Sequence, residues 1–291
     1  MATLTMMEQT DTPKPHMQVV EGPHDLTTET SNIASEGLDT KSALEIARII
    51  SHEDAKVASA VRKALPEIAV VIDIVARALR DGGRLIYVGA GSSGRIAALD
   101  ASECPSTYST LPAQVQYIMA GGPKALASAS GSTPYVVGAV EYARARGAIT
   151  AAITCNTGTP LAEVSDTTIV VEVGPEVVSG STRMKAGTAQ KMICNMITTG
   201  AMTRLGYVFD NQMVNVHMKN AKLVERGIRV LMRVCGIDRD SAIRTIKSAG
   251  KSIPIAVVML KAGVDKMEAV RRLAKSDGNV RLAIDDSRLE L

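Results

Sequence analysis

The sequence predicts an α/β protein, a doubly wound parallel sheet with a helical N-terminal segment and a small C-terminal helical bundle. Short apolar stretches alternate with helical patterns between residues 84 and 173, which is typical of parallel strands covered by helices on both faces. A glycine-rich turn, GAGSSGR, follows the first of these stretches, at the edge where α/β sheets bind ligands. The 291 residues are 46% hydrophobic, enough for a large domain with its own core and a small second one.

Each element is placed by its own pattern. Residues 1–25 show no sustained periodicity and are predicted to be a disordered leader. From Leu44, apolar residues recur at three- and four-residue steps, which predicts helices with a break near Pro66 and an end at Gly82. Strands are expected at residues 84–88, 115–119, 148–154 and 168–173, with a helix before the third.

The pattern beyond Gly174 is helical. The segment MKAGTAQKMICNMITTGAMTRLG is rich in Met and Ile and is predicted to be a core or subunit-interface helix. From Asp238, glycines at positions 250, 263 and 278 separate three short amphipathic helices. We therefore expect a leader (1–25), a main domain (26–235) and a C-terminal three-helix domain (236–291).

Composition excludes several function classes. The chain has 33 basic and 30 acidic residues, no Trp and one Phe, so a nucleic-acid partner is not expected. The four cysteines lie far apart without a CxxC pair, which favours reduced thiols and a cytoplasmic protein. The histidines are equally scattered, so no protein-built metal site is expected. No apolar stretch is long enough to span a bilayer, and no membrane association is predicted.

The turn GAGSSGR, residues 89–95, is the first candidate site. Its glycines let a ligand approach the backbone, and the N–H groups of the helix that follows favour an anion. The GxGxxG spacing indicates a dinucleotide only weakly, because the second strand ends in AGG and not in an acidic residue. A compact phosphomonoester fits the hydroxyls better, and a tight turn that binds nothing is the alternative. The predicted ligands are Gly91, Ser92, Ser93 and Gly94.

The tetrapeptide SGST occurs twice. The first copy precedes Pro134 at a helix start, where its hydroxyls either cap the helix or bind phosphate. The second copy, which begins at Ser179, is followed by basic residues at 183, 185 and 191. A solvated basic face is one interpretation, but basic side chains at a helix start are unfavourable unless an anion or a carboxylate compensates. The predicted ligands are Ser130, Gly131, Ser132, Thr133, Ser181, Arg183 and Lys185.

Two segments, LIYVGAGSSGRIAALDASECPSTY and GPEVVSGSTRMKAGTAQK, resemble the N-acetylmuramic acid 6-phosphate etherase family. This family includes the related glucokinase regulatory proteins and is built on the sugar isomerase (SIS) domain. The resemblance runs from Thr28 to the C-terminal helices and is closer to the etherase branch. It implies a homodimer with shared active sites and a sugar-phosphate substrate.

The resemblance also implies the reaction. The lactyl ether at C3 is cleaved to give N-acetylglucosamine 6-phosphate and D-lactate. The C1 aldehyde of the open-chain sugar acidifies the C2 proton, a base removes it, an acid protonates the departing oxygen, and water adds to the unsaturated intermediate. No metal or organic cofactor is needed. The matching segment assigns the proton donor to Glu103, which we expect in a partly buried loop just before Pro105.

The chain departs from the family pattern at one place. In the family, the strand ending in AGG is followed by a helix that carries a second catalytic glutamate, and then by another strand. Here only PKALA separates Gly122 from SASGSTP, too short for a parallel crossover. We therefore expect that one helix-strand unit is absent near residues 122–128, and no residue is assigned as the second carboxylate. An impaired sugar-phosphate-binding regulator and a sugar-phosphate isomerase are the alternatives, and the second segment counts against the isomerase.

Overall fold

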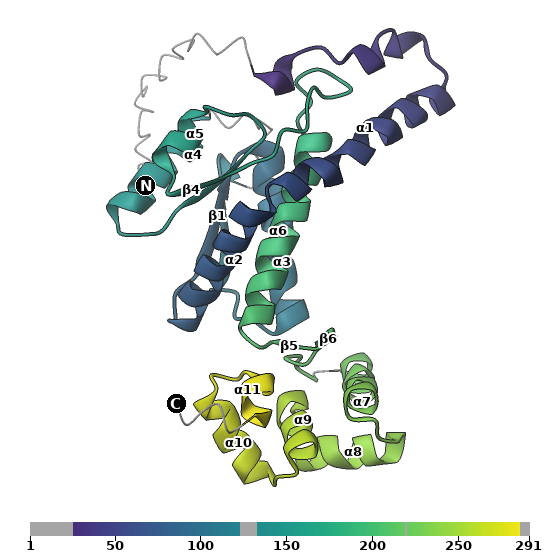
Figure 1. The fold of residues 1–291 in the computed structure, drawn as a ribbon, viewed down its shortest axis with the longest axis vertical. Coiled ribbons are helices and arrows are strands. Elements are labelled where there is room, and N and C mark those ends of the chain that lie inside the picture. The colour runs from purple at the N-terminus through teal and green to yellow at the C-terminus, as the bar shows by residue number, and fades with distance from the viewer. Residues whose placement is uncertain (1–25, 123–132, 219, 286–291) are drawn as a thin grey trace, which may run out of the picture.

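The structure is a computed structural model that describes residues 26–122, 133–218 and 220–285 (Figure 1). The predicted leader, residues 1–25, lies outside the described residues. Two long helices follow three short 3₁₀ helices; the bounds are η1 Thr27–Glu29, η2 Ile33–Ser35, η3 Leu38–Thr40, α1 Ala43–Lys63 and α2 Leu65–Arg80. A capping box between Ser42 and Glu45 begins α1. Pro66 lies in the first turn of α2, so the predicted break between the two helices is confirmed.

The α/β class and the parallel pairing of the strands are confirmed. β1 (Leu85–Gly89) pairs in parallel with β2 (Val115–Met119), and β3 (Ala151–Thr154) pairs in parallel with β4 (Thr167–Val170). The helices between these strands are α3 Gly91–Tyr108, α4 Pro134–Ala145 and α5 Pro160–Val164. β3 begins three residues later than predicted, because the Ala148 N–H donates to the Ala143 carbonyl and continues the end of α4.

The two strand pairs do not join into one sheet within the described ranges. β1 has β2 as its one strand neighbour there, and β3 has β4. Helix α2 contacts both β1 and β4, so the two pairs share a helical layer although their backbones are not hydrogen-bonded to each other. The described strands therefore form two separate pairs and not the single continuous sheet that was predicted.

Helix α6 (Lys185–Arg204) is the centre of the first hydrophobic core. It packs against α1, α2 and α3, and its side chains at Ile193, Ile197 and Met202 are almost fully buried. The prediction of a core helix for this Met- and Ile-rich segment is confirmed. Its thioethers fill space between helices, as expected for flexible apolar side chains.

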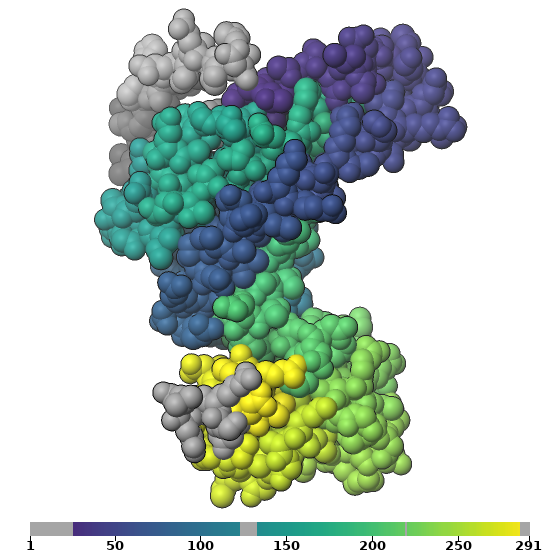
Figure 2. Space-filling view, viewed as in Figure 1, coloured from purple at the N-terminus to yellow at the C-terminus, as the bar shows by residue number. Residues whose placement is uncertain are grey.

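The C-terminal region is helical, as predicted, and forms a lobe of its own below the main body (Figure 2). It contains a short antiparallel hairpin and five helices: β5 Val208–Phe209, β6 Gln212–Met213, α7 Ala221–Cys235, α8 Arg239–Ser248, α9 Ile253–Ala262, α10 Lys266–Lys275 and α11 Val280–Ile284. The three predicted helices correspond to α8, α9 and α10. Gly263, with φ +66°, ends α9 in the left-handed conformation that favours glycine.

The second hydrophobic core runs from Phe209 to Ala283 and includes α7. The predicted boundary between residues 235 and 236 stays a prediction, and this packing favours an earlier one. No helix in the described ranges combines the length and the apolar character needed to cross a membrane. All four cysteines are free thiols.

Candidate active site

The turn after β1 brings Gly89 and the start of α3 into close contact. A Cβ on Gly89 would lie 2.7 Å from the Gly94 nitrogen, so a larger residue cannot occupy this position without moving backbone atoms. Gly91 begins the helix with φ +54°. The predicted loop is therefore shorter than expected, because Ser92, Ser93 and Gly94 form the first turn of α3. In this structure, the glycines at these spacings allow a tight turn between β1 and α3.

Among the residues that the structure describes, no side chain caps the N-terminus of α3. Ala90 at the N-cap provides no side-chain hydrogen bond, and the first turn holds no acidic residue. The first N–H groups of a helix have no partner within it and carry partial positive charge. Ser92 and Ser93, which are half-buried, add hydroxyl groups to this turn. The arrangement is suited to an anion such as a phosphate group.

Helices α3 and α6 run parallel, which places their starts at the same end. Asp100 and Tyr108 on α3 are hydrogen-bonded to Lys191 and Thr199 on α6, and both pairs are 91 residues apart. A Cβ at Gly187 on α6 would lie 3.5 Å from Ile96 on α3, again 91 residues apart. Because the two helices run in the same direction, the segment before α6, which carries the second SGST copy, leads into the helix start on the same side as the start of α3. The predicted phosphate contacts of Ser181 and Arg183 stay predictions.

The residues before α6 divide into exposed and internal groups. Arg183 is exposed and Ser181 is half-buried, so both are accessible to solvent. The N-terminus of α6 is already occupied, because the fully buried Glu176 carboxylate accepts hydrogen bonds from the Lys185 and Ala186 N–H groups at 2.9 and 3.0 Å. The N–H groups at the start of α6 are therefore bound by a side chain of the protein itself and are not free for an external anion.

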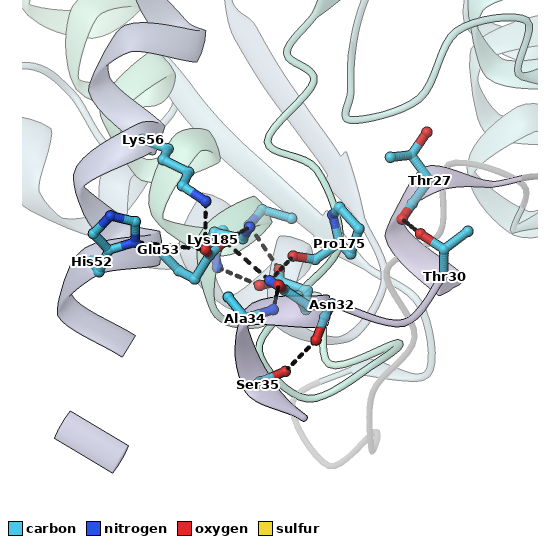
Figure 3. A network of polar contacts seen from close by, with 12 residues as sticks. Thr27, Thr30, Asn32, Ala34, Ser35, His52, Glu53, Lys56, Pro175 and Lys185 are labelled. Carbon is cyan, nitrogen blue, oxygen red and sulfur yellow. Dashed lines mark hydrogen bonds and ion pairs between the residues drawn. The ribbon is translucent and has the colours of Figure 1, made fainter. Parts of the chain in front are cut away.

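Lys185 points into the protein and not toward a ligand. Its side chain is 1% exposed, and its Nζ lies 2.8 Å from the Glu53 carboxylate of α1, which is 2% exposed (Figure 3). Asn32 also donates to Glu53, at 3.0 Å, and Lys56 forms a further ion pair with it. The sequence analysis expected an anion or a carboxylate to balance the basic residues at this helix start. For Lys185, the balancing group is the Glu53 side chain of the protein itself. The predicted ligand role of Lys185 stays a prediction, and its geometry favours a structural role.

The first SGST copy cannot be placed in full. Ser130, Gly131 and Ser132 lie outside the described residues. Thr133 precedes α4 and makes no side-chain cap hydrogen bond to it, so its hydroxyl is not used to begin the helix. Its predicted contact with a phosphate stays a prediction.

Glu103 lies within α3, and the predicted loop position is wrong. The helix continues through Pro105 to Tyr108, because Cys104 and Tyr108 are buried in the core and hold the last turn in place. The Glu103 carboxylate is 57% exposed and lies 3.1 Å from Lys191 Nζ. Glu103 is 11 residues from Ser92, which corresponds to about 16 Å along the helix.

Two groups of residues at the site were not predicted from the sequence. One is Asp100 with Tyr87, which are joined by a 3.0 Å hydrogen bond next to Lys191. The other is Glu53 and Glu176, which neutralise the start of α6. The need for carboxylates beside Lys185 and Lys191 was visible in the sequence. Their identity was not, because the partners are between 9 and 132 residues away.

Gly89→Ala is expected to disrupt the anion site. The added methyl group would overlap the Gly94 backbone at the start of α3, so the strand-to-helix turn must shift. The variant should lose stability by about 1–3 kcal/mol and lose the thermal stabilisation given by hexose 6-phosphates. Gly138→Ala on α4 is the matched control, because nothing lies within 4 Å of its added Cβ. Equal thermal shifts for both variants would contradict this assignment.

Comparisons with known proteins agree with the fold. The glucokinase regulatory protein N-terminal SIS domain matches residues 67–134, and the SIS domain matches residues 110–200. Proteins named N-acetylmuramic acid 6-phosphate etherase are similar over most of their length. The protein of Klebsiella aerogenes is 44% identical, over 90% of this chain and 98% of that protein. The protein of Aeromonas hydrophila is 45% identical, over 86% and 95%. A solved structure from Silicibacter pomeroyi, assigned as a phosphosugar isomerase, has a TM-score of 0.40 at 19% identity, over 73% of this chain and 66% of that chain.

This chain is shorter than its relatives within the aligned region. The Klebsiella alignment spans 293 positions and includes 90% of the 291 residues, which is about 262, so about 31 positions have no counterpart here. The Aeromonas alignment spans 282 positions and includes 86%, about 250, which leaves about 32. A shortfall of this size corresponds to one helix-strand unit. It supports the predicted absence of such a unit.

Proposed function

This chain belongs to the N-acetylmuramic acid 6-phosphate etherase family, and we propose that it cleaves the lactyl ether at C3 of N-acetylmuramic acid 6-phosphate. The products are N-acetylglucosamine 6-phosphate and D-lactate, so the enzyme is a carbon-oxygen lyase. We assign it to the recycling of cell-wall amino sugars in the cytoplasm. The observation that carries the proposal for this chain is the N-terminus of α3, whose N-cap residue makes no side-chain hydrogen bond and whose first turn holds two serines and no acidic residue.

The phosphate of the substrate is placed at this helix start. The first N–H groups of α3 and the hydroxyls of Ser92 and Ser93 donate hydrogen bonds to its oxygens, and Arg183 adds positive charge from the neighbouring segment. Ser181 lies on the same segment and completes the second side of the site. The backbone thus recognises a compact dianion without a metal ion.

The reaction at C2 and C3 needs a proton acceptor and a proton donor. The aldehyde at C1 of the open-chain sugar makes the C2 proton acidic, and the lactate oxygen leaves from C3 when it is protonated. Glu103 is the carboxyl group we assign to proton transfer, since it is exposed to solvent. The second carboxylate of the family pattern has no assigned residue in this chain.

The distance between Glu103 and the proposed phosphate site at Ser92 supports an active site shared between two copies of the chain. Glu103 lies about 16 Å along α3 from Ser92, farther than the phosphate of a hexose 6-phosphate lies from C3. One copy therefore cannot bind the phosphate at Ser92 and reach C3 with its own Glu103. We propose a homodimer in which the partner copy provides this carboxylate. The exposed apolar side chains of Ile33 and Leu44, on the segment that projects from the body (Figure 1), offer apolar surface for such an assembly.

A second candidate function is a regulator that binds the sugar phosphate without cleaving it. The shortfall of about 31 positions relative to the etherases favours it, because the helix start proposed to bind the phosphate is present while one expected catalytic carboxylate has no counterpart. Both functions predict the same ligand. They differ in whether D-lactate is released.

The Ser92→Ala variant tests the shared part of both proposals. Thermal unfolding is measured with N-acetylglucosamine 6-phosphate and with N-acetylglucosamine. We expect a thermal shift with the phosphate ester alone, and an affinity about tenfold weaker in Ser92→Ala, because a hydrogen bond to a charged group is lost. Ser248→Ala, on exposed surface of α8, is the control. Equal shifts with both sugars would overturn the phosphate site.

A further inference from the structure

Lys191 of α6 joins the exposed carboxylate of Glu103 to a buried one. Its Nζ lies 3.1 Å from Glu103 Oε2 and 3.3 Å from Asp100 Oδ1. The ammonium therefore bridges two carboxylates that are three residues apart on the facing side of α3. The Lys191 side chain is 26% exposed, so the bridge lies between the core and the solvent.

The Asp100 carboxylate, which is the buried partner of Lys191, is held in place by the protein core. Asp100 is almost fully buried, and its second oxygen accepts a 3.0 Å hydrogen bond from the Tyr87 hydroxyl of β1. Burial raises the pKa of Tyr87 well above its usual range, so this hydroxyl remains a donor. Both Asp100 oxygens thus have a partner, and the carboxylate gives Lys191 a fixed anchor.

Two cysteine thiols near Lys191 stay neutral. Cys104 on α3 and Cys194 on α6 lie beside Asp100, and burial raises the pKa of each thiol to about 12. Partial burial works against the charged form of Lys191, but its contacts with Glu103 and Asp100 outweigh this and raise its pKa. The ammonium is therefore a permanent charge near neutral pH and holds its partners without exchanging a proton.

We propose that Lys191 is the positioning residue of Glu103, anchored by Asp100 and Tyr87 so that the reacting carboxylate is held at one place on the surface of α3. This assignment rests on the proposed function, in which Glu103 transfers the proton. A free glutamate side chain samples several rotamers, whereas proton transfer requires the carboxyl within hydrogen-bond reach of the substrate. The ion pair provides that restriction without burying Glu103.

The role is tested in the full chain by carboxyl NMR with ¹³C-labelled glutamate. The Glu103 signal is assigned by its loss in Glu103→Gln. In Lys191→Met we expect this signal to change its chemical shift at neutral pH, because the ammonium group that donates a hydrogen bond to the Glu103 carboxylate is removed. In Lys191→Arg, which keeps a charged donor, the chemical shift should stay near that of the unmodified chain. Lys247→Met, an exposed lysine of α8, is the control and should leave it unchanged.

Kinetics provide the second measurement. Lys191→Met should lower kcat for D-lactate release by about 10- to 100-fold with little change in KM, because substrate still binds but the carboxyl is misplaced. If Lys191→Met does not fold, Asp100→Asn/Lys191→Met removes the unpaired buried charge and still frees Glu103. A Glu103 carboxyl signal that does not move in Lys191→Met overturns the inference. A chain that releases no lactate overturns the proposed function, and the carboxyl signal then still shows whether Lys191 holds Glu103.

Discussion

Glu103→Gln is expected to lower D-lactate release by about 10²- to 10⁴-fold, the range typical for loss of a positioned acid or base. The amide keeps the size of the side chain but cannot donate or accept the proton that the reaction moves. Because Glu103 is 57% exposed, its ion pair with Lys191 contributes little to stability. The variant should therefore unfold at nearly the same temperature as the unmodified chain.

The matched control for this variant is Glu163→Gln on α5, another exposed glutamate. It should retain full activity and full stability. Steady-state rates of D-lactate formation, with thermal unfolding of the same samples, separate a catalytic effect from a folding effect. Full activity in Glu103→Gln would contradict the role assigned to this residue.

Glu53→Leu is expected to destabilise the protein by about 3–5 kcal/mol, because it leaves the ammonium of Lys185 buried without its partner. Both side chains are at most 2% exposed and lie 2.8 Å apart. In Glu53→Leu/Lys185→Met both charges are removed, so a large part of the stability should return. Urea unfolding of the two variants, with the exposed Asp54→Asn as control, measures this difference. Equal instability of the single and double variants would contradict a buried ion pair.

The same pair predicts how stability depends on pH. Burial alone would raise the pKa of Glu53, but hydrogen bonds from Lys185, Lys56 and Asn32 outweigh it and lower the pKa from 4.5 to about 2. A carboxyl with a lowered pKa in the folded state stabilises the protein above its unfolded pKa, and this stability is lost as the pH falls. The loss should therefore occur between about pH 5 and pH 2. In Glu53→Leu/Lys185→Met this part of the dependence should be absent.

Local patterns were sufficient to predict most elements of the fold. Helical periodicity predicted α1 and α2 with their break at Pro66, and the apolar run at 115–119 matches β2 residue for residue. The helix through Pro105 was missed, because proline normally ends a helix, whereas here the burial of Cys104 and Tyr108 on both sides of the turn decides the conformation. The separation of the four strands into two pairs was not predicted, because the sequence analysis took the alternation of strands and helices to indicate one sheet.

The parts of the site that depend on neighbouring residues in the sequence were predictable, and those that depend on distant partners were not. The turn at Gly89 and the hydroxyls of Ser92 are local features, and their place at a helix start follows from the sequence. Lys185 is different: its charge indicated an anion, but the compensating carboxylate of Glu53 lies 132 residues away. Sequence alone does not distinguish a phosphate ligand from a buried ion pair, since both require a basic residue next to a negative charge.

The most direct test of the proposed etherase activity is product analysis after incubation of the chain with N-acetylmuramic acid 6-phosphate in D₂O. We predict D-lactate and N-acetylglucosamine 6-phosphate in equal amounts, with deuterium at C2 of the sugar, because the C2 proton is removed and then replaced from solvent. Substrate that binds but remains intact would contradict the etherase and favour the regulator. Lactate released with no deuterium at C2 would contradict the elimination mechanism.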